Sequence, residues 1–137
     1  MSAKDWATYG PIARALLGRT VLSGLPTNSL KLATDKADHR HAYIWVDPPW
    51  ELLRDGARLV GSAEYPHHEA PDYLERHTAW GAVVWPVLTD AVLTDVRSSV
   101  DGTTEFSFAG GVVLKVGTGE PEADGWALWY DDWYAKA

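Results

Sequence analysis

The sequence predicts an α+β fold that is predominantly antiparallel β-sheet, with two short helices. Its 137 residues are 46% hydrophobic and 23% charged, a size and composition typical of one globular domain. Two segments carry apolar residues at helical spacing, and short runs of branched and aromatic residues between turn signals fill most of the remaining chain. We therefore treat residues 1–137 as a single domain.

A helix followed by three strands is expected at the start of the chain. The apolar face of this helix recurs at three- and four-residue steps, at Trp6, Tyr9, Ile12 (or Ala13), Leu16 and Leu17. Gly18 follows directly, and glycine is typical of the end of a helix. The three strands are expected over residues 19–26, 29–34 and 41–47.

One further strand, a second helix and four more strands are expected in the rest of the chain. A turn signal at Arg54 to Gly56 precedes the strand expected over residues 57–65. The second helix is expected to begin near Pro71 and to end at Pro86. Its apolar face comprises Leu74, His77, Trp80 (or Gly81) and Val84. The last strands are expected over residues 91–97, 104–109, 112–116 and 126–130.

The two halves of the sequence resemble each other. Residues 16–25 align with 87–96, so that the apolar positions after each helix coincide. Further along, L-K-L-A matches F-S-F-A and A-Y-I-W-V matches V-V-L-K-V. This similarity indicates an internal repeat over residues 6–47 and 77–117, in which a helix and a three-stranded meander occur twice. The alternative is a chance likeness of short strand patterns.

Charge and composition exclude several classes of function. The net charge of −7 has the wrong sign for binding phosphates, so neither nucleic acid nor an anionic membrane is an expected partner. The chain has no cysteine, which excludes disulfides and thiolate zinc sites. The first ten residues lack the apolar core of a signal peptide, and no run is long enough to span a membrane. We therefore expect a cytoplasmic protein.

The motif Asp47-Pro48-Pro49-Trp50 follows an apolar run. It resembles the active-site motif of amino-group N-methyltransferases that act on adenine. That resemblance implies that the Asp holds the amino group and that the aromatic residue stacks on the base. The chain, however, has no glycine-rich G-x-G-x-x-G element for a cofactor. The structural alternative is that the prolines stop a strand and that Trp50 caps the core.

Histidines and serines give no strong signal of catalysis. His39 and His41 lie two residues apart on an expected strand and are candidates for a ligand loop together with Asp47 and Trp50. His67-His68 adjacency is poor spacing for metal ligands, and no H-E-x-x-H or G-x-S-x-G motif occurs. We therefore expect no metal, no cofactor and no catalytic residue.

The aromatic residues are biased toward those with a polar group. Eight Trp and six Tyr accompany two Phe, and the C-terminal run G-W-A-L-W-Y-D-D-W-Y combines aromatic rings with acids. If this run is one strand, Trp129, Asp131 and Trp133 share a face. Aromatic anchors flanked by carboxylates suit a basic protein partner. The candidate partner-binding residues are Trp129, Asp131, Asp132, Trp133, Glu120 and Glu122.

A C-terminal signature gives one further resemblance. The stretch D-G-T-T-E-F-S-F-A-G-G-V-V-L-K-V, followed by W-A-L, resembles the pattern of a family of small, uncharacterised bacterial proteins. The matching positions are Asp101, Gly102, Phe108, Gly111, Leu114, Val116 and Trp126. Members of that family are similar in size and acidity to immunity proteins that neutralise toxins. The resemblance implies a β-meander and no established activity.

Three functional hypotheses follow. The first is an immunity- or antitoxin-like inhibitor that covers a basic, toxin-like protein through an acidic and aromatic face. The second is a small-molecule- or nucleotide-binding enzyme domain centred on the D-P-P-W loop. The third is a homo-oligomeric structural subunit, because edge strands of a duplicated meander can pair between copies.

Overall fold

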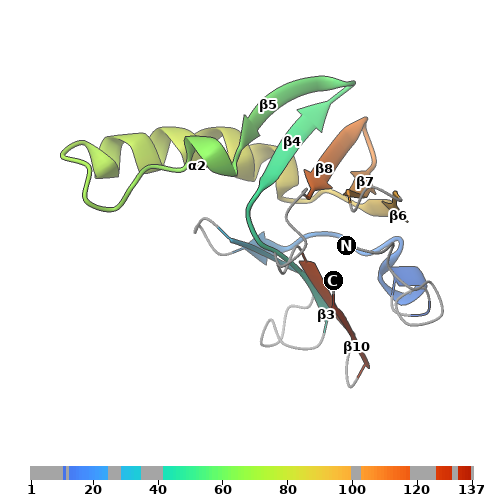
Figure 1. Cartoon of the computed structure of the whole chain (residues 1–137). Coiled ribbons are helices and arrows are strands. Elements are labelled where there is room, and N and C mark those ends of the chain that lie inside the picture. Colours follow the sequence, from blue (N-terminus) through green and yellow to red (C-terminus); the bar gives the residue numbers. More distant parts are fainter. Residues whose placement is uncertain are drawn as a thin grey trace.

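The computed structural model describes residues 11, 13–24, 29–34, 42–99, 103–117, 126–130 and 133–136. Within these residues, ten strands form two five-stranded sheets in which every pairing is antiparallel (Figure 1). Helical segments accompany the sheets, and the predicted α+β class with predominantly antiparallel sheet is confirmed.

The first sheet has the strand order β1-β2-β3-β9-β10. Its strands are β1 (Ser23–Gly24), β2 (Leu30–Ala33), β3 (Ala42–Val46), β9 (Trp126–Tyr130) and β10 (Trp133–Lys136). The second sheet has the order β5-β4-β8-β7-β6. Its strands are β4 (Trp50–Arg54), β5 (Ala57–Gly61), β6 (Leu93–Ser98), β7 (Thr104–Phe108) and β8 (Val112–Val116). A 3₁₀ turn, η1 (Ser62–Glu64), and the helix α2 (Tyr73–Leu88) connect β5 to β6.

The first predicted helix is described only at its C-terminal end. Residues 11 and 13–16 are helical, and Ala13 and Leu16 are buried as the spacing predicts. Leu17 is 38% exposed, because the helix has already ended there. Gly18 follows with φ +82°, a conformation that glycine adopts without steric cost, and its N–H donates to the carbonyl of Leu93 at 2.7 Å. Trp6, Tyr9 and Ile12 lie outside the described residues.

Helix α2 corrects two details of the prediction. It continues through Pro86 to Leu88, because the proline forfeits only one hydrogen bond in the last turn while Leu88 is fully buried. Leu74, predicted on the core face, is 78% exposed. Figure 1 shows the reason: the first turns of α2 extend beyond the sheets, where no core lies beneath them. The buried face consists of Trp80, Val84 and Leu88.

Eight strands lie where the sequence predicts them, although several are shorter. The strand predicted over residues 57–65 ends at Gly61, where η1 begins. The sequence does not predict two of the strands, β4 and β10, and each is one arm of a hairpin. β4 follows the two prolines directly, and β10 is separated from β9 by two residues. Asp55 and Gly56, with φ +51° and +83°, form the tight turn from β4 to β5.

The connectivity repeats along the chain. A helix is followed by the meander β1-β2-β3 in the first half and by β6-β7-β8 in the second. The hairpin β4-β5, which follows the first meander, joins the sheet of the second. The hairpin β9-β10, which follows the second meander, joins the sheet of the first. Each sheet is therefore completed by a hairpin that the other half of the chain contributes.

The registers of the two sheets correspond. Trp50 pairs with Val116 where β4 joins β8, and Trp126 pairs with Val46 where β9 joins β3. Each of these tryptophans begins the pattern W-x-L-x-x-D, over residues 50–55 and 126–131. The strand registers make residues 30–33 of β2 correspond to residues 104–107 of β7. The sequence similarity instead aligns residues 30–33 with F-S-F-A, residues 106–109, so it is shifted by two positions. Duplication of the sequence itself stays a prediction.

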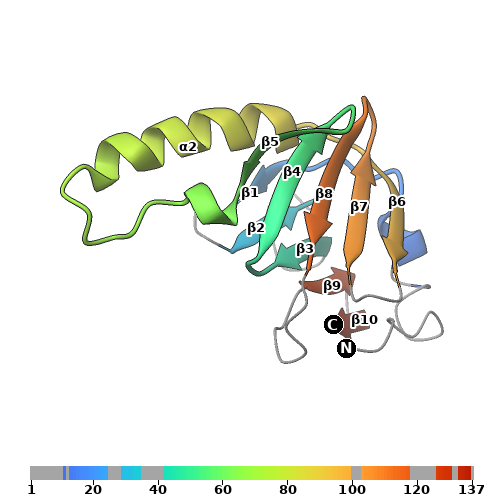
Figure 2. The same cartoon turned by 45° about the horizontal axis from the view of Figure 1, so that its top comes forward.

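The hydrophobic core lies between the two sheets. In Figure 2 the strands β4, β8, β7 and β6 run across the direction of β1, β2 and β3 behind them. Alternate residues of β3, β7 and β8 are buried, as expected for strands with one face on a core. Phe106, Ile44 and Leu114 are among the largest fully buried side chains. The other face of each sheet points away from this core.

Candidate functional site

The outer side of the first sheet presents aromatic residues. In β3, Ala42, Ile44 and Val46 point into the core and are buried, whereas Tyr43 and Trp45 alternate with them and are partly exposed. The core does not fully bury these two residues, which lie on the side of β3 that faces away from it. We refer to Tyr43, Trp45 and Asp47, together with the β9 position Trp129 that pairs with Tyr43, as the outer aromatic face.

Strand register brings part of the predicted C-terminal site to this face. Tyr43 pairs with Trp129, and Trp129 pairs with Tyr134 on the next strand. The strand predicted over residues 126–130 is β9, and β10 begins separately at Trp133, so the condition under which Trp129, Asp131 and Trp133 would share a face is not met. Trp133 pairs with Tyr130 and therefore stands outside the row that contains Trp129.

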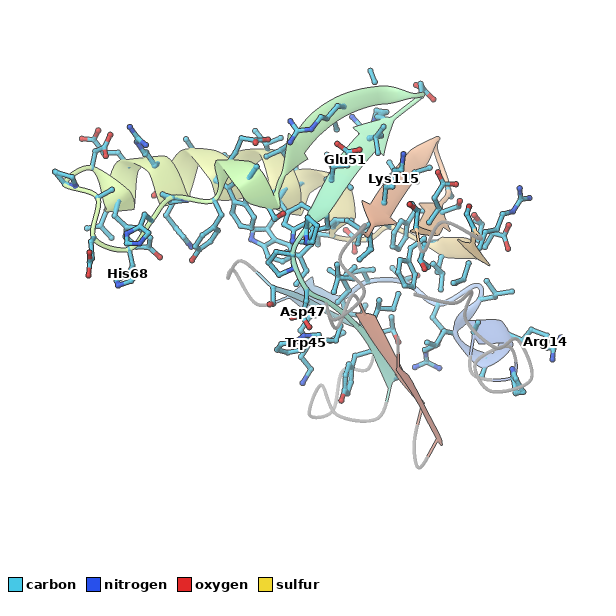
Figure 3. All side chains as sticks on the ribbon, in the orientation of Figure 1. Arg14, Trp45, Asp47, Glu51, His68 and Lys115 are labelled. Atoms are coloured by element: carbon cyan, nitrogen blue, oxygen red, sulfur yellow. The ribbon has the colours of Figure 1, made fainter. Side chains whose placement is uncertain are left out.

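Asp47 adds an acid beside the aromatic residues. Its Oδ1 accepts a hydrogen bond from the Ser29 hydroxyl at 2.7 Å and another from Trp45 Nε1 at 2.8 Å. Figure 3 shows Trp45 and Asp47 next to each other at the end of β3. Two donors on one oxygen fix the carboxylate, and among the described residues Oδ2 accepts no hydrogen bond. The carboxylate can therefore accept a further donor from outside.

One cation also contributes to this face. The ammonium of Lys31 lies 4.5 Å from the centre of the Tyr43 ring, in a cation–π contact. Lys31 pairs with Trp45 in the register of β2 and β3. The contact and the register together place Lys31 beside the two aromatic residues of β3.

Trp50 has a structural role. Its side chain is only 3% exposed and meets Trp80 edge to face, with ring centroids 5.9 Å apart. The peptide between Pro48 and Pro49 is cis, and the chain passes there from the first sheet to the second. A buried indole cannot stack on a nucleobase, so the resemblance to the methyltransferase motif does not extend to an accessible aromatic group.

Other predicted site residues fall outside the description or stand apart. Asp131, Asp132, Glu120, Glu122, His39 and His41 lie outside the described residues. His67 and His68 are exposed in the loop before α2 and stack with ring centroids 4.7 Å apart. Across the described ranges, no group of three or more His, Asp or Glu side chains is arranged to hold a metal ion. None of the helices described in the chain has the length and apolar character needed to cross a membrane.

A pocket opens on the outer side of the second sheet, and its lining includes Pro49 and Trp50 of the D-P-P-W loop, although the sequence did not predict its other residues. It has a volume of about 280 Å³. The residues that line it are Pro49, Trp50, Glu51, Arg58, Ser62, Ala63, Thr103, Lys115 and Gly117. We name it the crossover pocket, because it lies where the chain changes sheets after β3 and again after β8.

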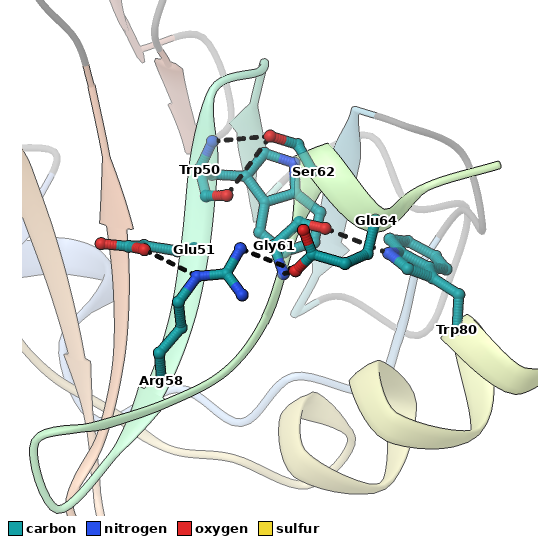
Figure 4. Close-up of polar contacts among 7 residues, drawn as sticks. All are labelled: Trp50, Glu51, Arg58, Gly61, Ser62, Glu64 and Trp80. Atoms are coloured by element: carbon teal, nitrogen blue, oxygen red, sulfur yellow. Dashed lines mark hydrogen bonds and ion pairs between the residues drawn. The ribbon is translucent and has the colours of Figure 1, made fainter. Parts of the chain in front are cut away.

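Arg58 organises one wall of the crossover pocket. Figure 4 shows its guanidinium between two carboxylates, with Nη2 2.6 Å from Glu64 and Nε 3.0 Å from Glu51. Its hydrogen bond to Glu64 is the main reason that the pKa of Arg58 is raised, and Glu51 contributes in the same direction. Strand alternation could have indicated this wall, because Glu51 lies between the apolar residues Trp50 and Leu52 in W-E-L-L-R.

An aromatic group surrounds the start of α2. The Tyr65 ring meets Trp80 edge to face at 4.9 Å, and the Tyr65 and Tyr73 hydroxyls are hydrogen-bonded at 3.0 Å. Burial, followed by this hydrogen bond, raises the pKa of Tyr65 to about 12. A cavity lined by Tyr65, Tyr73, Pro66, His67 and His68 lies beside it.

This raised pKa predicts a loss of stability at alkaline pH. The unfolded chain ionises its tyrosines near pH 10, whereas Tyr65 in the folded chain resists ionisation until about pH 12. The stabilisation is therefore fully present below pH 10 and is lost as the pH rises toward 12. Denaturant unfolding of the wild type and of Tyr65→Phe between these pH values measures this loss of unfolding free energy. The variant should lose less stability over this interval, and equal losses in both proteins would exclude Tyr65 as the cause.

Comparisons of the chain with protein families, with curated proteins and with solved structures find no match.

Proposed function

We propose that this chain is a protein-binding module that covers a basic protein partner with its outer aromatic face, in the manner of immunity or antitoxin-like inhibitors. The observation that carries the proposal is the pairing of Tyr43 with Trp129 beside the fixed carboxylate of Asp47. Tyrosine and tryptophan are the side chains that most often dominate binding energy in protein interfaces.

Charge supports the choice of a basic partner. The chain carries a net charge of −7, which accelerates encounter with a positively charged protein and repels acidic ones. Asp47 would accept a hydrogen bond from an arginine or lysine of the partner through Oδ2.

The second sheet provides an internal comparison. Its registers place Val113 and Leu53 at the positions that correspond to Tyr43 and Trp129. The second sheet therefore has aliphatic residues where the first sheet has aromatic ones. Formation of such a sheet does not require aromatic rings at these positions. A binding role gives a reason for the aromatic residues on the first sheet alone.

Affinity capture from the native cytosol tests the proposal. The bait is the full chain, and the matched baits are Tyr43→Ala/Trp129→Ala and, as a control on the corresponding positions, Val113→Ala/Leu53→Ala. We expect a basic protein that the wild type and the control retain, that the first variant loses, and that high salt weakens. Retention by all three baits, or an acidic partner, would contradict the proposal. Recovery of the chain's own untagged copies would instead support a homo-oligomer.

A further inference from the structure

The crossover pocket is a built feature of the second sheet. The N–H of Gly117, where the chain leaves β8, donates to the carbonyl of Pro49, just before β4, at 3.0 Å. The backbone N–H of Trp50 donates to the Ser62 hydroxyl at 3.0 Å, which ties η1 to the start of β4. These two hydrogen bonds therefore join pocket residues from three separate parts of the chain.

Gly61 allows the end of β5 to lie close to β4 at one wall of the pocket. A Cβ at this position would lie 2.8 Å from the carbonyl oxygen of Trp50, closer than side-chain carbons come to backbone atoms. Glycine therefore permits the end of β5 to pack against β4. The Glu64 carboxylate accepts from the Gly61 N–H at 2.9 Å and also binds Arg58. The same acid thus closes the turn and holds the guanidinium in place.

The two cations that line the pocket differ in their ion pairs. Arg58 is neutralised by Glu51 and Glu64. Lys115 lies between β4 and β7, where its register partners are Glu51 and Glu105, yet in the part of the chain that the structure describes its ammonium forms no ion pair or hydrogen bond. Figure 3 shows Lys115 and Glu51 on neighbouring strands. Among the described residues, Lys115 is therefore a cation of the pocket lining whose charge no ion pair neutralises.

We propose that the crossover pocket binds a small organic anion, with a carboxylate or phosphate group held by Lys115. An ammonium and an anionic oxygen form a charge-assisted hydrogen bond, and Lys115 is the lining residue that can donate one. Pro49 and Ala63 add apolar surface to the same lining for the body of the ligand. The volume of about 280 Å³ fits a small molecule and excludes a folded partner.

This inference does not rest on the proposed function. The outer aromatic face belongs to the first sheet and the crossover pocket to the second. Loss of ligand binding would leave the protein-binding proposal intact, and failure to capture a partner would leave the pocket proposal intact.

Titration of the isotope-labelled full chain with inorganic phosphate and, separately, with acetate tests the proposal by amide chemical shifts. Sodium chloride at matched ionic strength controls for screening. For such small probes we expect saturable shifts at Glu51, Lys115 and Gly117 with a dissociation constant of about 1 mM. Saturation by phosphate alone would assign a phosphate ester, and saturation by acetate alone would assign a carboxylate. Shifts that chloride reproduces would overturn the proposal.

Two variants and one control locate the site. Lys115→Gln should weaken binding of the probe about tenfold or more, because it removes a charge-assisted contact. Lys31→Gln, which removes a lysine from the first sheet, should leave binding unchanged. Ala63→Phe places a ring at the pocket from an exposed position on η1 and should block binding while Lys115 remains. Undiminished binding by either of the two pocket variants would overturn the proposal.

Discussion

Replacement of Trp80 by alanine is expected to lower the free energy of unfolding by about 3–5 kcal/mol. The indole is 4% exposed and lies between α2 and the second sheet, where it meets Trp50 and Tyr65 edge to face. Its Nε1 also donates to the carbonyl of Gly61 at 3.3 Å. Truncation removes the side chain that attaches the helix to β5 and leaves a cavity. A loss of this size is a large fraction of the stability of an ordinary domain.

Leu74→Ala on the same helix is the matched control. Leu74 is also a large apolar residue of α2, but its side chain is 78% exposed, so the change should stay within about 0.5 kcal/mol. Denaturant unfolding followed by circular dichroism measures both variants. Similar losses in the two would show that the buried face of α2 is not the one formed by Trp80, Val84 and Leu88.

The second large effect concerns the outer aromatic face. With the captured partner in hand, Tyr43→Ala is expected to weaken binding by about 2 kcal/mol, or about 30-fold, as for a central aromatic anchor. Tyr43 pairs with Trp129, and alanine at Trp129 is expected to have an effect of similar size. Isothermal titration calorimetry measures both affinities. Val113→Ala, at the corresponding position of the second sheet, should bind as the wild type does.

Asp47→Asn separates charge from shape at the same face. The amide oxygen can still accept hydrogen bonds from Ser29 and Trp45, so the local geometry should persist. Loss of the negative charge should slow association and reduce its dependence on salt, with a smaller change in dissociation. Stopped-flow kinetics at two salt concentrations measures this. An unchanged association rate would exclude Asp47 from the electrostatic part of recognition.

Local signals predicted most of the fold. The Gly18 helix end, the alternation in residues 42–46 and 104–108, and the turn at Gly110 and Gly111 each reflect backbone geometry that neighbouring residues determine. The sequence does not predict β4, because the two prolines before it favour the end of a strand. The D-G turn at Asp55 and Gly56 was recognised, but a tight turn of this type requires a strand on each side.

The exchange of hairpins could not be predicted from local pattern. Nothing in the residues 50–54 indicates whether that strand pairs with β3, its neighbour in sequence, or with β8, its neighbour in the sheet. The internal likeness of W-x-L-x-x-D at Trp50 and Trp126 was present in the sequence, and it becomes meaningful once the corresponding registers are known. Long-range pairing of this kind depends on the whole core.

The candidate site was predicted in part. Sequence composition indicated an acidic and aromatic surface near the C-terminus, and register places Trp129 beside Tyr43. The sequence predicts Tyr43 and Trp45 only as members of a strand, because alternation alone does not say which side of a sheet meets the core. In the sequence, Asp47 belongs to a motif that resembles a catalytic one, whereas in the structure its hydrogen bonds connect it to Trp45 and Ser29.

Amide hydrogen exchange of the complex with the captured partner tests the central claim most directly. Binding through the outer aromatic face predicts slower exchange in β2, β3 and β9, around Tyr43 and Trp129, and unchanged exchange in β4, β8 and β7. Protection confined to the second sheet, or spread evenly over the chain, would contradict the proposal that this face binds the partner.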